Sequence, residues 1–326
     1  MKNKKVLITG AGGFIGSNLA EHCVEKGWRV KAFVRYNSNN SWGWLETSRY
    51  KNEIEVVSGD MRDYDSVSSA IKGCDAVFHL AALIGIPYSY RSPLAYIKTN
   101  IEGTYNLLQS ARKYTLESIL ITSTSEVYGT AQYVPIDEQH PVVGQSPYSA
   151  SKIAADQLAI SFHRSFDLPV KIVRPFNTYG PRQSARAIIP TVITQICAGK
   201  KDLKLGNTSP TRDLTYVMDT ARGFLAVAKE KAFIGQVTNI GNNEEITIGN
   251  LVKLIAELMG VQINIITAEE RVRPKQSEVE RLWCDNKKLI KNTGWTPKYD
   301  LRNGLKKTIR WIEKNMVYFK PDQYVK

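Results

Sequence analysis

A glycine-rich turn near the N-terminus constrains the fold of this chain more than any other feature. The short apolar run 6–9 has the character of a strand, and it leads directly into Gly10-Ala11-Gly12-Gly13-Phe14-Ile15-Gly16, where a helix is expected to begin. Glycines in such a turn let the backbone approach a pyrophosphate, which the helix N-terminus attracts. Gly10, Gly13 and Gly16 have a GxxGxxG spacing, and their position at the N-terminus favours a dinucleotide site over a plain turn.

The rest of the first half alternates short β-rich runs with helical stretches. Strands are expected at 4–9, 29–34, 54–57, 75–80, 117–122 and 170–174. Helices are expected at 13–26, 63–72, 93–113 and 148–166. Such alternation predicts an α/β fold with a Rossmann-type, doubly wound parallel sheet.

The pattern changes around 175–190, where Pro175, Pro181 and Pro190 interrupt it. Beyond this point helices are expected at 189–199, 217–230, 248–259, 285–292 and 301–315. Short strands are expected at 202–205, 236–240 and 262–265. We therefore expect an NAD(P)-binding Rossmann domain at 1–175 and a smaller mixed α/β substrate-binding region at 176–326, with the chain crossing back between them.

Composition narrows the class of partner. Apolar residues make up 43% of the 326 residues and charged residues 23%, which predicts an ordinary globular core. The net charge of +13 is spread along the chain without a basic block, which argues against nucleic acid and suits phosphate groups of a small molecule. No run approaches the roughly 18 apolar residues of a membrane span. The four scattered cysteines form no Cys-x-x-Cys pair, so we expect no metal site and a reducing cytoplasm.

The end of the second expected strand indicates which nicotinamide cofactor is bound. A carboxylate there takes the 2′-hydroxyl of NAD, whereas an arginine accommodates the 2′-phosphate of NADP. Strand 29–34 is followed by Arg35, and no acidic residue occurs before Glu46, which favours NADP. The alternative is that Arg35 is a surface cation and that NAD binds through main-chain and asparagine contacts. Asp60 and Met61 follow the third strand, where the carboxylate is expected to meet the adenine or to cap the next helix.

A tyrosine and a lysine four residues apart suggest proton chemistry. Tyr148 and Lys152 share one face of the expected helix 148–166, so the ammonium can lower the pKa of the phenol and ready it as a base. Thr124 can hydrogen-bond the same substrate hydroxyl, and the three groups suit oxidation of an alcohol. That chemistry does not need Glu126, which therefore indicates a second proton abstraction. The alternative for Glu126 is an exposed carboxylate near a strand end.

Further motifs follow in a fixed order along the chain. They are the turn 10–16, Asp60, His79-Leu80-Ala81-Ala82, Asn100-Ile101-Glu102-Gly103-Thr104, Ser123-Thr124-Ser125-Glu126, Tyr148-Ser149-Ala150-Ser151-Lys152, Arg174-Pro175-Phe176-Asn177-Thr178-Tyr179-Gly180-Pro181 and Gly294-Trp295-Thr296-Pro297. Over nearly the whole chain this order resembles the extended short-chain dehydrogenases of the NAD-dependent epimerase/dehydratase family. The resemblance implies that the sheet domain binds NAD(P) and that the C-terminal part binds a nucleotide-diphosphate sugar.

The resemblance also assigns roles to single residues. It implies that Ala81 and Ala82 line the nicotinamide ribose, that Asn100 supports the active site from its helix, and that Asn177 contacts the sugar diphosphate. His79 lies in an apolar strand and is expected to be a packed core residue.

Four basic residues are candidates for the substrate phosphates. Arg212 and Arg273 are the first choices, since a guanidinium fork matches phosphate oxygens. Lys204 and Arg281 are weaker candidates. For each of them the alternative is an ordinary surface cation.

The triplet Thr124-Ser125-Glu126 separates branches within the family. Four-epimerases tend to have small or apolar residues where Glu126 stands, whereas GDP-mannose 4,6-dehydratases and UDP-glucuronate decarboxylases both carry Thr-Ser-Glu. The segment 33–46 resembles bacterial dehydratases that act on nucleotide-linked N-acetylglucosamine. The decarboxylases usually have an acidic residue where Arg35 stands.

These resemblances lead to one hypothesis. The chain is predicted to be a lyase, a 4,6-dehydratase of UDP- or GDP-N-acetylglucosamine that uses NADP, or alternatively NAD. Its catalytic residues are expected to be Thr124, Ser125, Glu126, Tyr148 and Lys152. A UDP-glucuronate decarboxylase, a sugar epimerase and a catalytically silent dinucleotide-binding scaffold are the alternatives. Relatives dimerise through helices equivalent to 93–113 and 148–166, which implies a homodimer with no membrane or nucleic-acid partner.

Overall fold

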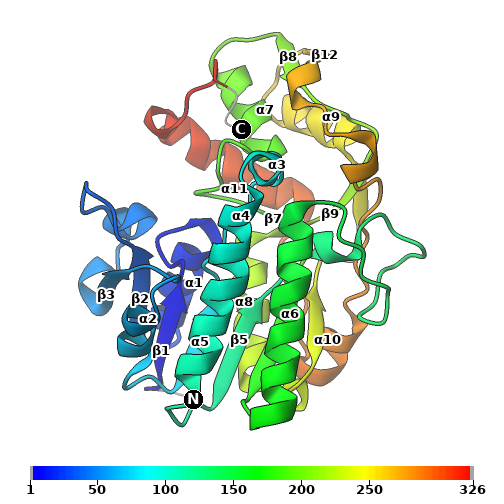
Figure 1. Cartoon of the computed structure of the whole chain (residues 1–326). Coiled ribbons are helices and arrows are strands. Elements are labelled where there is room, and N and C mark those ends of the chain that lie inside the picture. Colours follow the sequence, from blue (N-terminus) through cyan, green and yellow to red (C-terminus); the bar gives the residue numbers. More distant parts are fainter. Residues whose placement is uncertain (1–2, 324–326) are drawn as a thin grey trace.

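A seven-stranded parallel sheet forms the centre of the molecule (Figure 1). The structure, a computed structural model, describes residues 3–323. The strand order is β10-β6-β5-β4-β1-β2-β3, and each neighbouring pair is parallel. The strands are β1 (Lys5–Thr9), β2 (Arg29–Arg35), β3 (Ile54–Gly59), β4 (Ala76–His79), β5 (Ser118–Thr122), β6 (Val170–Pro175) and β10 (Val237–Ile240). The predicted Rossmann-type sheet is confirmed, and the order reverses between β1 and β4, where such sheets bind ligands.

Helices cover both faces of the sheet, which explains why its strands are almost continuously apolar. One face carries α1 (Phe14–Glu25), α8 (Val217–Lys229) and α10 (Lys287–Thr293). The other face carries α2 (Tyr64–Ile71), α5 (Gly103–Ala111) and α6 (Pro147–Phe166). Since β10, α8 and α10 come from the second half of the sequence, the chain crosses back into the sheet layer. The domain boundary at residue 175 stays a prediction.

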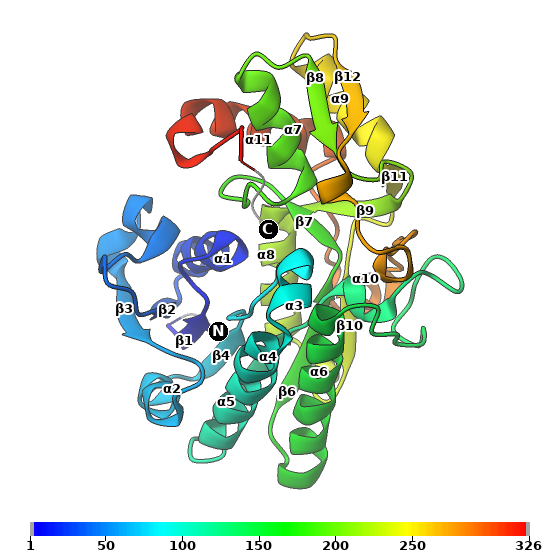
Figure 2. The ribbon, with the colours of Figure 1, turned by 45° about the horizontal axis from the view of Figure 1, so that its top comes forward.

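A second, smaller layer lies beyond the carboxyl edge of the sheet (Figure 2). It contains a three-stranded sheet of β7 (Asn177–Tyr179), β9 (Thr211–Tyr216) and β11 (Glu245–Thr247), and a pair of β8 (Asp202–Leu205) and β12 (Asn264–Thr267). Its helices are α7 (Ile188–Cys197), α9 (Ile248–Leu258) and α11 (Leu301–Lys314), which share one apolar core. β7, β9 and β11 were not predicted, because these short strands carry polar or charged residues without a clear alternation.

The helix expected at 93–113 is not continuous. It consists of α4 (Pro93–Tyr96), a π-helical turn (Ile97–Glu102) and α5, and α3 (Ile86–Arg91), which was not predicted, precedes it. A π-helical turn inserts extra backbone into a helix and frequently marks a functional position. Here it carries Asn100.

Short 3₁₀ helices complete the described chain. They are Gly43–Thr47, Lys51–Glu53, Ser125–Tyr128, Lys231–Phe233, Glu269–Arg271, Lys275–Ser277 and Met316–Tyr318. Within residues 3–323, no helix combines the length and apolar character needed to cross a membrane.

Candidate active site

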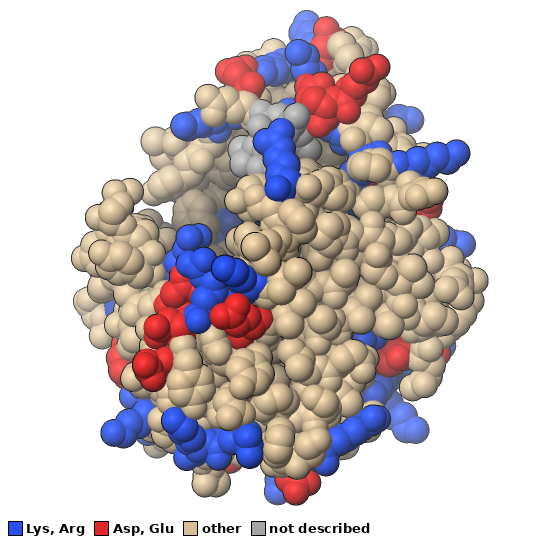
Figure 3. Space-filling view, viewed as in Figure 1, with Lys and Arg blue, Asp and Glu red and all other residues tan. Residues whose placement is uncertain are grey.

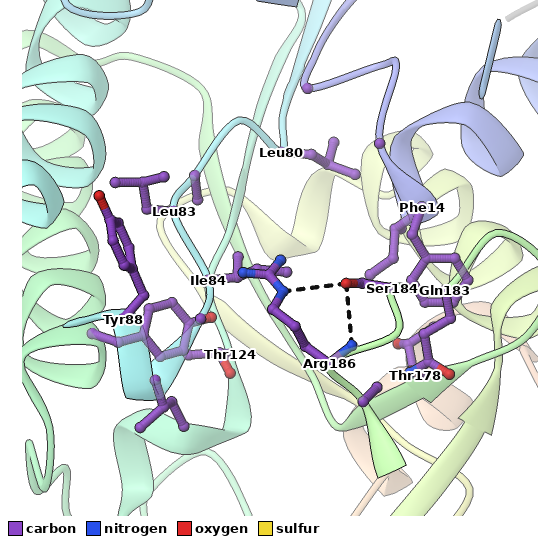
Figure 4. A pocket seen from close by; sticks show the side chains of 18 of the residues that line it. Phe14, Leu80, Leu83, Ile84, Tyr88, Thr124, Thr178, Gln183, Ser184 and Arg186 are labelled. Atoms are coloured by element: carbon purple, nitrogen blue, oxygen red, sulfur yellow. Dashed lines mark hydrogen bonds between the residues drawn. The ribbon is translucent and has the colours of Figure 1, made fainter. Parts of the chain in front are cut away.

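One large cavity lies between the carboxyl edge of the sheet and the second layer, and Figure 4 shows part of its lining. Its volume is about 1320 Å³. Single drug-sized ligands usually occupy roughly 300–1,000 Å³, so this cavity has room for two ligands side by side. One end is lined by the glycine-rich turn and the other by Arg212 and Arg273.

The glycine-rich turn has the geometry of a dinucleotide cradle. Gly10 has a φ of +69°, and a Cβ there would lie 2.8 Å from the backbone nitrogen of Ala81. A Cβ on Gly12 would lie 2.5 Å from the carbonyl oxygen of Trp42, and one on Gly16 would collide with the Gly10 carbonyl. No side chain caps the N-terminus of α1 at Gly13, so its backbone N–H groups are open to a pyrophosphate. The residues at this end therefore fit a dinucleotide, and Phe14 and Ile15 line the same end.

Two arginines, Arg35 and Arg62, line the part of the cavity where the adenosine is expected. Arg35 is exposed at the end of β2 and lines the cavity. Asp60 accepts hydrogen bonds from the backbone nitrogen and the Nε of Arg62, both at 2.9 Å. The hydrogen bond from Arg62 lowers the pKa of Asp60, and the charge of Arg35 adds to this. Met61 is buried beside them. Arg62 was not predicted, and it donates hydrogen bonds to Asp60, the carboxylate that was expected to meet the adenine.

The predicted catalytic residues meet in the cavity. β5 ends at Thr122, and the 3₁₀ helix Ser125–Tyr128 follows at once, with Thr124 accepting a hydrogen bond from the Glu126 backbone nitrogen at 3.2 Å. A capping box at Ser146 starts α6, and this places Tyr148 and Lys152 in its first two turns. The cavity lining therefore includes all five residues, which are Thr124, Ser125, Glu126, Tyr148 and Lys152.

Burial controls the protonation of this pair. It raises the pKa of Tyr148, while the Thr124 hydroxyl opposes the shift and the Glu126 charge adds to it. Burial lowers the pKa of Lys152 to about 8, and its ammonium donates to the Thr122 carbonyl at 2.6 Å. Desolvation therefore raises the pKa of Tyr148 in the chain alone, and the expectation that Lys152 lowers it stays a prediction.

Asn100 connects the loop after β4 to the catalytic helix. Its Nδ2 donates to Ser151 Oγ at 2.9 Å and to the Leu83 carbonyl at 3.0 Å, and its Oδ1 accepts from the Leu83 nitrogen at 2.8 Å. Ser151 in turn donates to the Tyr148 carbonyl at 2.7 Å. The π-helical turn thus holds α6 from behind the cavity.

His79 is a buried structural residue. Its Nδ1 lies 2.8 Å from Thr9 Oγ1 and its Nε2 lies 3.1 Å from Thr104 Oγ1. Thr9 Oγ1 also accepts from the Ala81 nitrogen at 3.1 Å, and Ala81 and Ala82 line the cavity. Burial lowers the pKa of His79 to about 3, so the imidazole is neutral.

The opposite end of the cavity is cationic. Arg212 and Arg273 each lie 3.5 Å from the same Glu278 oxygen. Burial lowers the pKa of Arg212, and the charge of Glu126 opposes this, so Arg212 lies within electrostatic reach of the Glu126 carboxylate. Asn177 lines this cavity with a buried Oδ1 that has no hydrogen-bond partner among the described residues.

The two weaker phosphate candidates, Lys204 and Arg281, lie outside the cavity lining. Lys204 is exposed on β8 between the buried Leu203 and Leu205, so the strand alternation points it away from the second-layer core, and it does not line the cavity. Arg281 donates to Glu245 at 3.0 Å and is also outside the lining. The structure does not bring these two residues to the site.

Loop residues complete the wall and were missed by the sequence analysis. Arg186 donates from Nε to Ser184 Oγ at 3.2 Å and reaches toward the loop that carries Ile84 and Tyr88 (Figure 4). A Cβ on Gly85 would lie 2.7 Å from the Arg186 guanidinium. These segments are far apart in sequence and have no periodic pattern, so no local signal identified them.

Comparison with known proteins identifies the family. Residues 7–308 match the family model described as GDP-mannose 4,6 dehydratase. The chain belongs to this family. A putative UDP-glucose 4-epimerase of Methanocaldococcus jannaschii is 30% identical over 95% of this chain and 99% of its own length. A dTDP-glucose 4,6-dehydratase of Streptomyces antibioticus is 30% identical over 97% of this chain and 94% of its own length.

Solved structures give the same picture. The dTDP-glucose 4,6-dehydratase of Bacillus anthracis in complex with NAD has a TM-score of 0.85 at 28% identity, over 98% of this chain and 99% of the other. The UDP-glucuronic acid 4-epimerase of Bacillus cereus in complex with UDP-glucuronic acid and NAD has a TM-score of 0.86 at 28% identity. The match covers 95% of this chain and 99% of the other. The protein is therefore an NAD(P)-dependent enzyme of the nucleotide-sugar dehydratase and epimerase family, and the resemblance to extended short-chain dehydrogenases is confirmed.

Proposed function

We propose that the protein is a 4,6-dehydratase that converts UDP- or GDP-N-acetylglucosamine to its 4-keto-6-deoxy product. The observation that carries this proposal is Glu126, a carboxylate in the cavity whose charge acts on both Tyr148 and Arg212. A carboxylate between the proposed oxidation site and the proposed phosphate site is positioned for a proton abstraction that simple alcohol oxidation does not need.

The proposed roles follow from the chemistry of each side chain. When bound, the nicotinamide supplies a hydride acceptor and donor for the sugar. Tyr148 takes the proton of the C4 hydroxyl, and Thr124 orients that oxygen. A ketone at C4 acidifies the C5 hydrogen, so Glu126 removes it as a base. Ser125 assists departure of the C6 hydroxyl, which takes up a proton and leaves as water. A proton returned to C5 and the hydride returned to C6 then complete the 4-keto-6-deoxy sugar.

The ends of the cavity support the choice of ligands. Arg212, Arg273 and Asn177 are proposed to bind the diphosphate, because two guanidinium groups and the amide nitrogen of Asn177 in the cavity lining can donate hydrogen bonds to phosphate oxygens. Arg35 and Arg62 favour NADP, since both are cations beside the expected ribose. NAD is the cofactor named for several structural neighbours and is the alternative. The choice of N-acetylglucosamine rests on the resemblance of segment 33–46.

A homodimer is proposed through α5 and α6, as relatives suggest. The apolar side chains of Leu94, Ile97, Tyr105 and Phe166 are exposed on this side of the molecule. Figure 3 shows a wide stretch over α6 with few charged residues. We also propose a cytoplasmic location, in line with four unpaired cysteines.

A 4-epimerase is the second candidate, because several relatives and structural neighbours carry that name. A panel of sugar nucleotides followed by mass spectrometry tests the proposal. Loss of water from UDP- or GDP-N-acetylglucosamine is the expected result. An unchanged mass with an altered sugar configuration would show that the protein is an epimerase. Loss of carbon dioxide from UDP-glucuronate would show that it is a decarboxylase. Cofactor binding without any turnover would show that it is a silent scaffold.

A further inference from the structure

Asp156 lies directly behind the Tyr148–Lys152 pair. It stands one helical turn after Lys152 and two turns after Tyr148, on the same face of α6. Its exposed fraction is 0%. A carboxylate is rarely buried to this degree without partners that hold it in place.

The carboxylate of Asp156 joins three separate parts of the site. Its Oδ2 accepts from Ser123 Oγ at 2.8 Å, and Ser123 directly precedes Thr124. The same oxygen accepts from Arg174 of β6, at 3.0 Å from Nη2 and 3.2 Å from Nε. The Arg174 guanidinium lies 4.8 Å from the ring centre of Tyr128, which ends the 3₁₀ helix that carries Glu126.

Stability alone does not explain this arrangement. Replacing a buried ion pair by apolar residues is often neutral or stabilising, so such a pair is weak evidence of a stabilising role. The Asp156–Arg174 pair instead connects α6, β6 and the segment 123–128 at the point where they hold the catalytic groups.

The charge of Asp156 also acts on Lys152. The lysine donates to a backbone carbonyl, and Asp156 raises its pKa against the larger effect of burial. Other titratable or charged groups interact electrostatically with Tyr148, Lys152 or Arg174. They are His79 on β4, Tyr96 on α4, Glu126 and Tyr128 on the 3₁₀ helix, Tyr148 on α6 and Arg174 on β6.

We propose that Asp156 is a positioning residue that fixes α6 against the Thr124–Glu126 turn and keeps Lys152 charged. The inference rests on the proposed roles of Tyr148 and Lys152. It concerns a residue that touches neither cofactor nor substrate.

The variant Asp156→Asn tests the proposal, because its amide oxygen can still accept from Ser123 while the charge is lost. We expect kcat to fall by about tenfold or more, with KM little changed, since misplaced catalytic groups slow the chemical step. The alkaline limb of the kcat profile should move to lower pH by about one unit, since an opposite charge within a few ångströms shifts a pKa by at least that much.

Asp219→Asn is the matched control. Asp219 is equally buried, pairs with Arg222 at 2.5 Å and accepts from the Lys298 nitrogen at 2.9 Å, but it does not line the cavity. This variant should lose thermal stability without moving the alkaline limb. If Asp156→Asn changes kcat and the pH profile no more than Asp219→Asn does, the positioning role is wrong.

A second readout separates this inference from the proposed reaction. The pH dependence of amine modification at Lys152, followed by mass spectrometry, needs no turnover, and Asp156→Asn should shift it downward. An unshifted profile would overturn the inference even if the dehydratase is active. If Asp156→Asn does not fold, Ser123→Ala decides: it keeps the ion pair and should lower kcat without moving the alkaline limb. A wild-type kcat in Ser123→Ala would contradict the positioning role.

Discussion

The two ends of the cavity are built in different ways. The cofactor end is made by the carboxyl ends of neighbouring parallel strands and by one turn, 10–16, that is continuous in sequence. The sugar end is made by side chains from β7, β9 and loops that meet from distant parts of the chain, such as Asn177, Arg212 and Arg273. The proposed catalytic residues lie in the same cavity as these two groups of residues.

This difference has a functional consequence. A cradle formed by backbone approach tolerates little change, because a side chain added at Gly10, Gly12 or Gly16 collides with main-chain atoms. A wall formed by separate side chains can exchange one ligand group for another without altering the fold. Relatives named as dehydratases and epimerases of several sugar nucleotides share the fold of this chain, as this division predicts.

The largest effect is expected at the junction of the two ends. Glu126→Gln should lower dehydration by about 10²- to 10⁴-fold, the usual contribution of a general acid or base. Binding of cofactor and sugar nucleotide, measured by calorimetry, should be unchanged. Glu278→Gln is the matched control, since this carboxylate lines the same cavity but contacts the phosphate-site arginines. It should alter KM rather than kcat, and normal turnover of Glu126→Gln would remove Glu126 from the mechanism.

Gly10→Ala tests the rigidity of the cofactor end. The added methyl group would lie 2.8 Å from the Ala81 nitrogen, so we expect a cost of about 2–3 kcal/mol. A shift of the turn that relieves this contact should also weaken cofactor binding, and an equal loss of binding energy would be on the order of a hundredfold in affinity. Gly294→Ala is the control: Gly294 has a similar φ of +66° but nothing within 4 Å. It should cost about 1–2 kcal/mol of stability from backbone strain alone and leave cofactor binding intact. Equal cofactor affinity in the two variants would contradict the cradle.

Arg273→Met tests the sugar end with a smaller expected effect. Arg273 is preferred to Arg212 for this test, because Arg212 is buried and acts on Glu126. Loss of a charged hydrogen bond to phosphate should raise KM for the sugar nucleotide by about 10- to 100-fold with kcat little changed. Lys204→Met removes a cation outside the cavity and should leave KM unchanged. Equal KM values in both variants would place the diphosphate elsewhere.

The sequence predicted which residues of the glycine-rich turn and of the proposed catalytic group meet in the cavity, because spacing along single elements determines their positions. Gly10 to Gly16 belong to one strand-turn-helix unit, and Tyr148 and Lys152 to one helix face. The meeting of Arg186 with Gly85 depends on packing between distant segments, which no local pattern records. Asp60 and Arg62 are only two residues apart, but their pairing is not part of any motif used for the prediction. Lys204 was misplaced for a related reason: its side of β8 is decided by the apolar core of the second layer.

Segment 33–46 lies at the cofactor end of the cavity, although its resemblance was used to choose the sugar. Arg35, Trp42 and Gly43 line the cavity beside the glycine-rich turn. The Trp44 nitrogen donates to the Gly12 carbonyl at 3.0 Å, so the segment packs on the cofactor cradle. Its sequence therefore bears on cofactor choice more directly than on the sugar.

Arg35→Ala tests that cofactor choice and has the smallest expected effect. An exposed guanidinium that binds a 2′-phosphate should contribute about five- to tenfold in NADP affinity, since solvent screens an exposed charge pair. NAD lacks this phosphate, so its affinity should be unchanged. Arg49→Ala removes another exposed arginine, which pairs with Glu25 outside the cavity, and should change neither affinity. Parallel titrations with both cofactors measure the ratio of NADP affinity to NAD affinity. If Arg35→Ala leaves this ratio unchanged, Arg35 is a surface cation, and the cofactor end distinguishes NADP from NAD through the main chain alone.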